Sequence, residues 1–538
     1  MKRILCFVMS VMMIVSLASC SEKEEQPEDM IIHYNITVEP VTLDPQIAND
    51  SGSRLVILNI FEGLVRLDKD DNPVPGVAKS WTVSDDQKVY TFHLREEACW
   101  SNGTGVTADD FVFGIQRAIQ PSTGSETAYT LYNIKNAEAV NKGKSDVSDL
   151  GISAENKTTV KIELEHPDSG FLNVLATPPA MPCNREYFEK SGGQYGRDDD
   201  KILSNGAFMV KESGWSHNEY IYLRKNQYYA GEDDPIPAGV NITIEDSPSD
   251  IIEAVSDGTI DCYAIPGSLS DKAEEKGLII TSFADTVWGI SFNTSDETLK
   301  NAKVRKALLS ALDRDFILKT LPVGCTAVSD IIPETVKLDG NYYRDFVGRN
   351  LSVPFSENAK QQLSDSLQSD ETEETPKLNI LCTNDSATRS IVNNIIQSWN
   401  SLMTSHVNKT PVSRSELNER ITSGDYNVII APLKVSGSSP IATLELFRSD
   451  SDYNLAKLSD KKYDEYIDKI KKAPDFSSID TILTAEKYLN DNGIFYPLYI
   501  ENRCYISASS VTGIIFHPYG GEADFFYAKK VTKSDESN

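Results

Sequence analysis

Residues 90–111 contain two blocks, Tyr90-Thr91-Phe92-His93-Leu94-Arg95 and Trp100-Ser101-Asn102-Gly103-Thr104-Gly105-Val106-Thr107-Ala108-Asp109-Asp110-Phe111, that carry the most structural information in this sequence. Side chains of residues 89–94 alternate between two faces, which is the pattern of a half-buried strand. Asn102-Gly103 is a turn signal, and Thr107 followed by Asp110 resembles a capping box. The region therefore predicts a strand, a turn and a capped helix whose buried face includes Phe111.

Shorter blocks lie on both sides of this region. They read Glu39-Pro40-Val41-Thr42-Leu43-Asp44-Pro45, Phe61-Glu62-Gly63-Leu64, Pro75-Gly76-Val77-Ala78-Lys79-Ser80-Trp81, Asn205-Gly206-Ala207-Phe208, Gly258-Thr259-Ile260-Asp261 and Val304-Arg305-Lys306-Ala307-Leu308-Leu309-Ser310-Ala311-Leu312-Asp313-Arg314. In order and spacing, all these blocks resemble the oligopeptide, dipeptide and nickel binding proteins of ABC importers, which form solute-binding protein family 5. The resemblance spans about residues 31–314 and is weaker towards the C-terminus.

The resemblance implies an α/β fold, namely a type II periplasmic-binding-protein-like two-lobed clamp with an additional α+β domain. Such clamps close on their solute by hinge motion. The chain is accordingly divided into residues 1–19 as a lipoprotein signal peptide, 20–30 as an acidic tether, 31–66 with 202–284 and 507–529 as a discontinuous domain I, 67–201 as domain II (the α+β insertion) and 285–506 as domain III (the second lobe).

Hydrophobic periodicity predicts further elements. Residues 54–64 read as a helix that ends near Gly63, and the acidic segment 364–376 reads as an exposed loop. Farther on, patterns typical of a strand, two helices and a strand follow one another over residues 378–382, 386–402, 415–422 and 426–431. This β-α-β order predicts a parallel sheet with a right-handed crossover.

The N-terminus has the features of a bacterial lipoprotein signal. Lys2 and Arg3 precede an apolar run over residues 4–17, which is shorter than the roughly 20 residues that cross a bilayer. Leu17-Ala18-Ser19-Cys20 resembles a lipobox, in which cleavage exposes a cysteine that becomes diacylated. We therefore expect Cys20 to carry lipid. The alternative is an ordinary secreted protein with a chance cysteine at the cleavage site.

Composition restricts the possible partners and the redox chemistry. The net charge of −28 over 538 residues argues against nucleic acid, because phosphate binding requires clustered Lys and Arg. Hydrophobic residues at 40% and charged residues at 25% are typical of a well-folded soluble chain. Besides Cys6 and Cys20 there are six cysteines, at positions 99, 183, 262, 325, 382 and 504. Their wide spacing favours buried free thiols over a disulfide framework.

Motifs for metal or enzymatic chemistry were not found. The six histidines are scattered, without the i, i+4 spacing that places two metal ligands on one helical face. Asp68, Asp70 and Asn72 begin like a calcium loop, but Pro73 occupies the position that requires glycine, so the segment reads as a turn. No nucleophile elbow, P-loop or C-x-x-C motif is present. The sequence therefore predicts neither an enzyme nor a protein with a metal or cofactor.

The resemblance also implies ligand-binding positions. The family's peptide-binding members hold the ligand's ammonium group with an aspartate before a proline, and the matching position here is Ser436, ahead of Pro440. The expected carboxylate is missing, which leaves modified peptides, uncharged solutes and a differently anchored peptide open. The other implied positions are Asn49, Asp50, Ser51, Tyr263, Ile265, Trp288, Gly289, Arg414, Leu433 and Gly437. For each, a surface-loop or core position is the structural alternative.

These observations predict an extracytoplasmic substrate-binding lipoprotein of an ABC importer. It is expected to capture oligopeptides or related small solutes between its lobes and to deliver them to the permease by hinge closure. We expect a monomer on the extracytoplasmic face of the cell membrane, attached to the membrane by the lipid anchor only. A lipid-anchored peptide sensor without transport and a binder of a non-peptide solute remain alternatives, whereas an extracellular hydrolase is disfavoured by the missing nucleophile motif.

Overall fold

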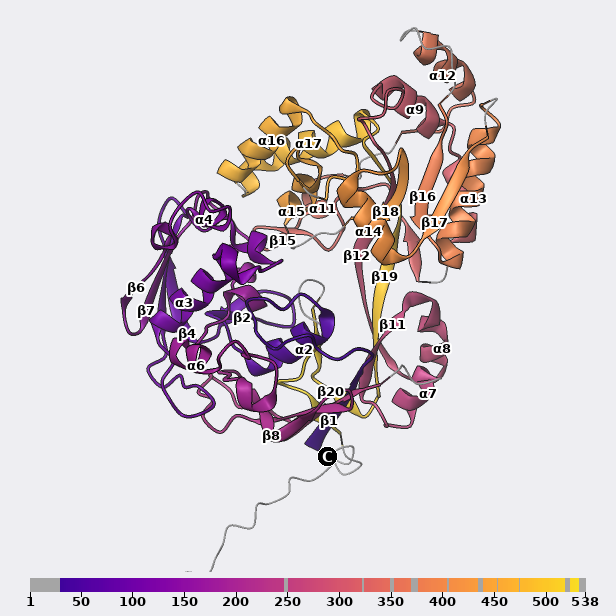
Figure 1. Cartoon of the computed structure of the whole chain (residues 1–538). Coiled ribbons are helices and arrows are strands. Elements are labelled where there is room, and N and C mark those ends of the chain that lie inside the picture. The colour runs from indigo at the N-terminus through magenta and orange to yellow at the C-terminus, as the bar shows by residue number, and fades with distance from the viewer. Residues whose placement is uncertain are drawn as a thin grey trace, which may run out of the picture.

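Two long antiparallel strands, β12 (Ile279–Phe292) and β19 (Phe495–Ser507), connect a lower and an upper lobe (Figure 1). Tyr505 near the end of β19 packs in the core of the lower, first lobe, whereas Ile290 and Leu498 pack in the upper, second lobe. The structure is a computed structural model and describes residues 30–245, 250–321, 324–348, 353–368, 376–403, 406–433, 439–451, 453–473, 475–517 and 523–531.

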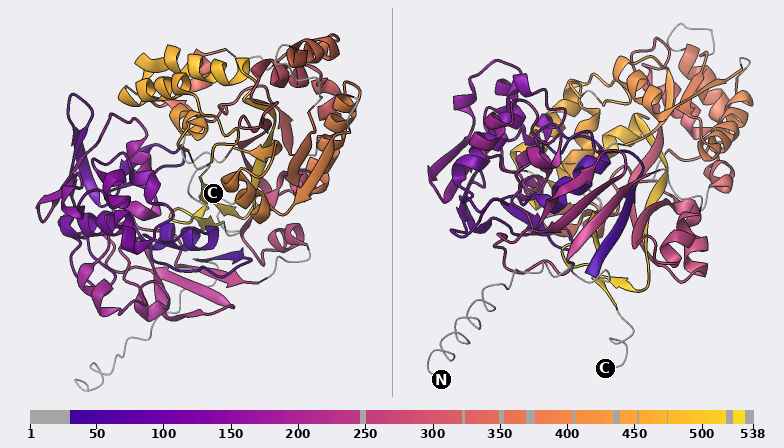
Figure 2. Two further views of the ribbon diagram at one scale, coloured as in Figure 1. Left: turned by 45° about the horizontal axis from the view of Figure 1, so that its top comes forward. Right: turned by 60° about the horizontal axis from the view of Figure 1, so that its bottom comes forward.

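The first lobe is built on a four-stranded sheet in the order β1 (Ile31–Ile36), β10 (Gly239–Ile244), β9 (Tyr220–Lys225) and β8 (Phe208–Ser216). Strand β1 is parallel to β10, and the other pairs are antiparallel. Figure 2 shows the indigo N-terminal strand and the yellow C-terminal segment in this same lobe. Asn59 fixes the C-terminal segment to this lobe, because its Nδ2 donates to the Ala523 carbonyl at 2.9 Å and its Oδ1 accepts from the Phe525 N–H at 3.1 Å.

An α+β unit with its own antiparallel sheet adjoins this lobe. Its strand order is β4 (Ala78–Val83), β5 (Val89–Leu94), β7 (Thr159–Glu163) and β6 (Ile152–Asn156), and helix α3 (Ala108–Ile119) packs on β6 and β7. The predicted strand and capped helix are confirmed. The Asp110 carboxylate accepts from the Thr107 N–H at 2.8 Å and from Thr107 Oγ1 at 3.0 Å, and Phe111 is fully buried.

Short elements complete the lower part of the molecule. The strand pairs are β2 (Val65–Leu67) with β3 (Pro73–Pro75), β20 (Val511–Thr512) with β23 (Lys529–Lys530), and β21 (Ile515–Phe516) with β22 (Ala523–Asp524). The helices are α2 (Ser51–Ile60), α4 (Ala137–Asn141), α5 (Phe171–Val174), α6 (Arg185–Lys190), α7 (Ile251–Ser256) and α8 (Ser270–Glu275).

The second lobe is organised around a seven-stranded sheet. Its order is β11 (Cys262–Pro266), β19, β12, β18 (Val428–Pro432), β16 (Asn379–Thr383) and β17 (Asn408–Val412), and β13 (Cys325–Ala327) pairs with β19. Strand β16 is parallel to both β17 and β18, so the predicted parallel arrangement is confirmed. The predicted boundaries at 284/285 and 506/507 fall within β12 and at the end of β19.

Helices pack around this sheet, and one small hairpin lies beside them. The helices are α9 (Ala302–Ser310), α10 (Arg314–Ile317), α11 (Tyr343–Phe346), α12 (Ala359–Gln368), α13 (Ser386–Asn400), α14 (Arg414–Ser423), α15 (Pro440–Leu444), α16 (Lys461–Lys472) and α17 (Ile479–Asp491), and the hairpin pairs β14 (Lys337–Leu338) with β15 (Asn341–Tyr342).

The predicted bounds of two elements were wrong. The helix expected over residues 54–64 is α2, which begins at Ser51 because the Asp50 carboxylate accepts from the Ser53 N–H at 2.7 Å. It ends at Ile60, where the Gly206 N–H binds the Ile60 carbonyl at 2.7 Å and the chain becomes extended. The loop expected from residue 364 instead continues helix α12 to Gln368, because Leu367 is buried against the second-lobe core.

The six cysteines beyond residue 20 are free thiols, and Cys183, Cys262, Cys382 and Cys504 are buried as predicted, whereas Cys99 and Cys325 are only partly buried. Burial raises the pKa of the Cys183 thiol to about 12, so this group stays protonated. In the part of the chain that the structure covers, no helix combines the length and the hydropathy needed to cross a membrane. The predicted signal peptide, the tether up to Asp29 and Cys20 lie outside the described residues.

Candidate functional site: a pocket between the lobes

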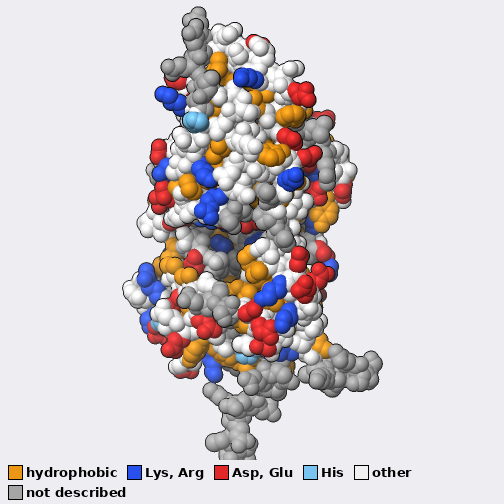
Figure 3. Space-filling view, turned by 90° about the vertical axis from the view of Figure 1, so that its right-hand side faces the viewer, with side chains coloured by type: hydrophobic (Ala, Val, Ile, Leu, Met, Phe, Trp, Pro, Cys, Tyr) orange, Lys and Arg blue, Asp and Glu red, His pale blue; other side chains and the backbone are white. Residues whose placement is uncertain are grey.

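A pocket of about 960 Å³ lies between the two lobes. The lower part of the molecule contributes residues within 58–71, 126–142 and 165–181, and the second lobe contributes residues within 439–453 together with Lys471. The space-filling view shows a hollow at the waist between the upper and the lower lobe (Figure 3). Because small-molecule sites have volumes of roughly 300–1,000 Å³, this pocket is the candidate ligand site.

Two of the sequence blocks meet at the first-lobe wall of the pocket. Asn205 Nδ2 donates to the Glu62 carbonyl at 2.9 Å, and the Glu62 N–H donates to Asn205 Oδ1 at 3.2 Å. Gly206 permits this contact, since a Cβ there would lie 2.6 Å from the carbonyl carbon of Ile60. The Glu62 carboxyl accepts from Tyr229 Oη at 2.6 Å. Burial raises the pKa of Glu62, and the Tyr229 hydrogen bond opposes that rise.

The wall formed by the α+β unit contains a second buried carboxyl, that of Asp168. It accepts from the Gly170 N–H at 2.8 Å and from Asn133 Nδ2 at 3.4 Å. Burial raises the pKa of Asp168, whereas the Gly170 hydrogen bond and the neighbouring His166 oppose the rise. The negative charge of Glu445 in the second lobe adds to the rise as a smaller effect. Asp168 and Glu445 are therefore electrostatically coupled across the pocket.

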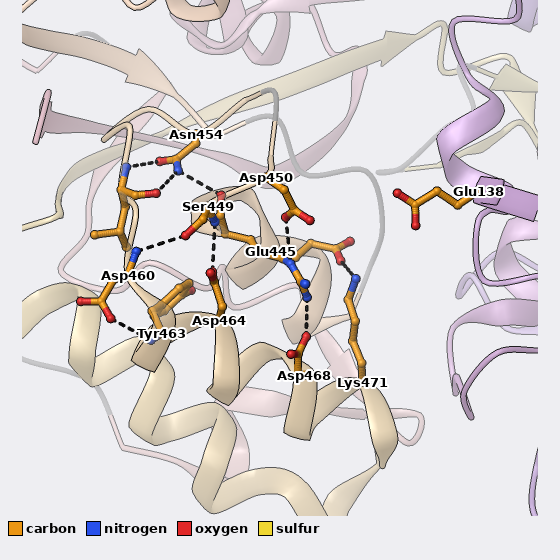
Figure 4. A network of polar contacts seen from close by, with 12 residues as sticks. Glu138, Glu445, Ser449, Asp450, Asn454, Asp460, Tyr463, Asp464, Asp468 and Lys471 are labelled. Carbon is orange, nitrogen blue, oxygen red and sulfur yellow. Dashed lines mark hydrogen bonds and ion pairs between the residues drawn. The ribbon is translucent and has the colours of Figure 1, made fainter. Parts of the chain in front are cut away.

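The second-lobe wall follows helix α15 and carries a network of ion pairs (Figure 4). Glu445 pairs with Lys471 of helix α16 at 2.9 Å. Arg448 bridges Asp450 at 2.8 Å and Asp468 at 2.5 Å. In Figure 4, Glu138 of the α+β unit projects towards Asp450 and Glu445 from the other side of the gap. Acidic side chains thus face one another across the pocket.

Trp288 and Arg414, two of the implied ligand positions, come together next to this wall. The Arg414 guanidinium lies over the Trp288 ring at 5.6 Å, and the Trp288 ring stacks on Tyr499 with centroids 5.8 Å apart. Trp288 Nε1 donates to Glu501 at 2.8 Å, and Arg414 lies 3.6 Å from the same carboxylate. Sequence reasoning missed Glu501 and Tyr499, because neither lies in a recognised sequence block.

Asn49, Asp50 and Ser51 lie around the start of helix α2. Asn49 Nδ2 donates to Glu126, which lines the pocket, at 2.6 Å. The Asp50 carboxylate caps α2, and Ser51 is the exposed first residue of that helix. Asn49 therefore lies at the edge of the pocket, whereas Asp50 has a structural role in this conformation.

The remaining implied positions differ in burial and in their contacts. Tyr263 is half-buried and stacks on Tyr34, whereas Ile265 and Leu433 are buried. Gly289 allows close packing, because a Cβ there would lie 2.4 Å from the Phe495 ring. Ser436 and Gly437 lie outside the described residues. None of the nine implied positions that are described lines the 960 Å³ pocket itself, so their ligand roles stay predictions.

Three consecutive aspartates, Asp198, Asp199 and Asp200, hold carboxylate oxygens within 4.8 Å of one another. Asp199 already accepts from the Gly214 N–H at 3.2 Å, and Asp200 pairs with Lys201. The group lies away from the pocket lining and is partly exposed. Hydrogen bonding and ion pairing within the chain account for these side chains, so we assign no metal centre to them.

A model of a protein family matches residues 72–454, which include the α+β unit and much of the second lobe. Its description is "Bacterial extracellular solute-binding proteins, family 5 Middle". This chain belongs to that family. Family 5 solute-binding proteins bind their ligands without transforming them, so the prediction that the chain is not an enzyme is confirmed.

Relatives within family 5 match the chain along most of its length. The dipeptide-binding protein DppE of Bacillus subtilis is 27% identical over 502 residues, covering 93% of this chain and 92% of the relative. The oligopeptide-binding protein OppA of the same organism is 29% identical over 526 residues, covering 94% and 93%.

Solved structures of the family share the fold. The substrate-binding domain of an oligopeptide ABC transporter from Bacillus anthracis superposes with a TM-score of 0.75 at 27% identity, covering 94% of this chain and 99% of that one. Such neighbours are two-lobed type II binding proteins, so the predicted fold class is confirmed.

Proposed function

We propose that this protein captures oligopeptides or related small solutes in the pocket between its lobes and delivers them to the permease of an ABC importer. The location of the pocket between the two lobes is the main support for the proposal, because a solute that touches both walls couples binding to closure of the lobes. The names of the two Bacillus subtilis relatives, which bind dipeptides and oligopeptides, point to the same ligand class.

The chemistry of the lining suits a peptide. An unpaired backbone N–H or carbonyl costs about 1–3 kcal/mol when it is buried, so the site must offer hydrogen-bonding partners. Asn133, Asn173 and Thr130 line the pocket beside the aromatic rings of Tyr132 and Tyr453. Amide and hydroxyl groups can pair with the ligand backbone, while water can fill space around side chains of different sizes.

Mass spectrometry of solutes that co-purify with the protein tests the ligand class. We expect short peptides, and adding them to ligand-free protein should reduce the radius of gyration measured by small-angle scattering. Recovery of a single non-peptide solute, together with flat melting curves across a peptide library, would contradict the proposal.

We further propose that the mature protein is anchored through lipid on Cys20. The lipobox-like Leu17-Ala18-Ser19-Cys20 supports this anchor. Metabolic labelling with an alkyne fatty acid should mark the wild-type protein but not Cys20→Ser, and globomycin should block maturation of the precursor. Maturation that is insensitive to globomycin would point to ordinary secretion.

Transport and sensing can be separated in cells. Deleting the gene should abolish uptake of a labelled co-purifying peptide, and wild-type protein should restore uptake. Normal uptake in the deletion strain would leave a sensory role as the better explanation.

A further inference from the structure

The pocket between the lobes is lined by many more acidic than basic side chains. Nine carboxylates line it, against four Lys or Arg side chains. The carboxylates belong to Glu62, Asp71, Glu126, Glu138, Glu165, Asp168, Glu445, Asp450 and Asp524. This imbalance lies within one cavity between two lobes, unlike the diffuse negative charge of the whole surface.

The basic side chains of the lining already have partners in the chain. Lys142 pairs with Glu138 at 2.6 Å, Lys471 pairs with Glu445 at 2.9 Å, and Arg448 bridges Asp450 and Asp468. Arg66 stacks over the Phe526 ring at 4.2 Å, within electrostatic reach of Asp524 and Glu62. These cations are therefore poorly available to an anionic ligand.

Three carboxylates of the α+β wall have neutral hydrogen-bond donors. Glu126 accepts from Asn49 Nδ2 at 2.6 Å, Glu165 accepts from the Asn136 N–H at 2.7 Å, and Asp168 accepts from Gly170 and Asn133. Across the described part of the chain, none of the three has a Lys or Arg within ion-pairing distance. Their negative charge is offset only at longer range, by His166 for Asp168 and by Lys135 for Glu165.

The acidic side chains of the two walls repel one another, as Asp168 and Glu445 illustrate. They belong to opposite walls, and the charge of Glu445 disfavours ionisation of Asp168. A positive group placed between them would reverse this repulsion, because an opposite charge in a poorly solvated site stabilises the ionised form. Tyr129 and Tyr132 line the same region and can contact the apolar stem and the charged head of a long cationic side chain.

We propose that the pocket selects cationic peptides, whose Lys or Arg side chains lie between Asp168 of the lower wall and Glu445 of the second lobe. The proposal rests on the proposed function, since it names the ligand class of the same pocket. The ligand adds positive charge to that of Lys471, which already pairs with Glu445, and thereby allows the two acidic walls to approach one another.

Titration calorimetry with ligand-free protein tests this proposal. The probes are alanine pentapeptides whose central residue is lysine, glutamine or glutamate. At low salt we expect the lysine peptide to bind about tenfold more tightly than the glutamine peptide and the glutamate peptide to bind most weakly, with the difference shrinking as salt screens the charges. Equal affinities for the three peptides would overturn cation selectivity and leave peptide capture intact, whereas no binding of any peptide would remove the proposed function itself.

Substitutions of the two pocket carboxylates test which residues cause the preference for cationic peptides. Asp168→Asn is expected to reduce the ratio of lysine to glutamine affinities at least about threefold, and Glu445→Gln should do the same if Asp168→Asn fails to fold. Glu186→Gln is the control, because Glu186 pairs with Lys190 on the surface and does not line the pocket. An unchanged ratio in both pocket variants would place the selectivity elsewhere and overturn the assignment. Spermidine that binds and displaces the lysine peptide would overturn the peptide part of the ligand class.

Discussion

Trp288 and Glu501 lie on neighbouring strands of the seven-stranded sheet, and the indole Nε1 of Trp288 donates a hydrogen bond to the Glu501 carboxylate at 2.8 Å. The side chain of Glu501 remains 46% exposed, and Arg414 lies 3.6 Å away. The carboxylate thus contacts both Trp288 and Arg414 and still reaches solvent. Ser436 is predicted from the sequence to occupy the family's ammonium-binding position, where it supplies no carboxylate. Glu501 lies beside the implied positions Trp288 and Arg414, so it is a candidate for that role.

Glu501→Gln should therefore weaken binding of peptides that have a free amino terminus. The amide oxygen can still accept from Trp288, so we expect the free energy of unfolding to change by less than about 1 kcal/mol. Affinity for free-amino peptides should fall about tenfold, because the ammonium group loses a charged partner. Calorimetry with each peptide and its N-acetylated form makes the comparison. Equal losses for both forms would show that Glu501 does not contact the amino terminus.

Removing the buried cation Arg117 should strongly destabilise the protein. Arg117 Nη2 lies 2.7 Å from Asp44 Oδ2, and their side chains are only 7% and 4% exposed. Arg117→Ala leaves Asp44 as an uncompensated buried charge, for which we expect a loss of about 3–5 kcal/mol in urea unfolding.

Lys190→Ala is the matched control for Arg117→Ala. Lys190 pairs with Glu186 at 2.5 Å, but both side chains are more than two-thirds exposed. Its loss should cost less than about 1 kcal/mol. Similar costs for the two variants would mean that the Asp44 pair contributes no more than a surface pair.

Gly206→Ala should displace the first-lobe wall of the pocket. The added Cβ would lie 2.6 Å from the Ile60 carbonyl carbon and 2.8 Å from the Phe61 nitrogen, and these backbone atoms cannot rotate away. We expect a destabilisation of about 2 kcal/mol or more, with weaker peptide binding because Glu62 moves with its backbone. Gly348→Ala, where a Cβ would meet nothing within 4 Å, is the control in thermal unfolding and calorimetry. A fully stable Gly206→Ala protein would rule out a tight contact at this point.

Asp168→Asn should stabilise the ligand-free protein at neutral pH. The pKa of Asp168 is raised by burial, so the folded state binds this proton more tightly than the unfolded state does. The ionised carboxyl therefore opposes folding above its raised pKa, and this cost disappears as the pH falls towards the ordinary aspartate value. The melting temperature of Asp168→Asn should exceed that of the wild type at pH 7 and converge with it in acid. A variant less stable than the wild type at pH 7 would show that the hydrogen bonds of Asp168 outweigh its desolvation.

Helices and strands could be predicted from the sequence where interactions between chain neighbours determine them. The strand β5 follows from alternating side chains, and the start of α3 follows from Thr107 and Asp110. The start of α2 was missed because Asp50 caps the helix earlier than its apolar pattern suggested. The end of α2 depends on Gly206, which lies far along the chain, so no local pattern could reveal it.

The ligand site was less accessible than the fold. The structure brings Trp288 and Arg414, two of the implied positions, into contact, but Glu501 beside them lies in no recognised block. Asp168 and Glu445 were not singled out either, since an isolated Asp or Glu in a sequence is usually a solvated surface residue. Their importance arises from burial and from facing each other, which are properties of the folded chain.

The sequence by itself determined the family, the two-lobed fold and the strands and capped helices whose patterns repeat over a few residues. Only the tertiary structure decided which carboxylates meet in the pocket, how Glu62 is held against Asn205 and why the cations of the lining are already paired. The physical reason is how far apart in the sequence the interacting residues lie. Hydrophobic periodicity and capping act between neighbours in the chain, whereas desolvation and Coulomb interactions across a cleft depend on how segments hundreds of residues apart are packed.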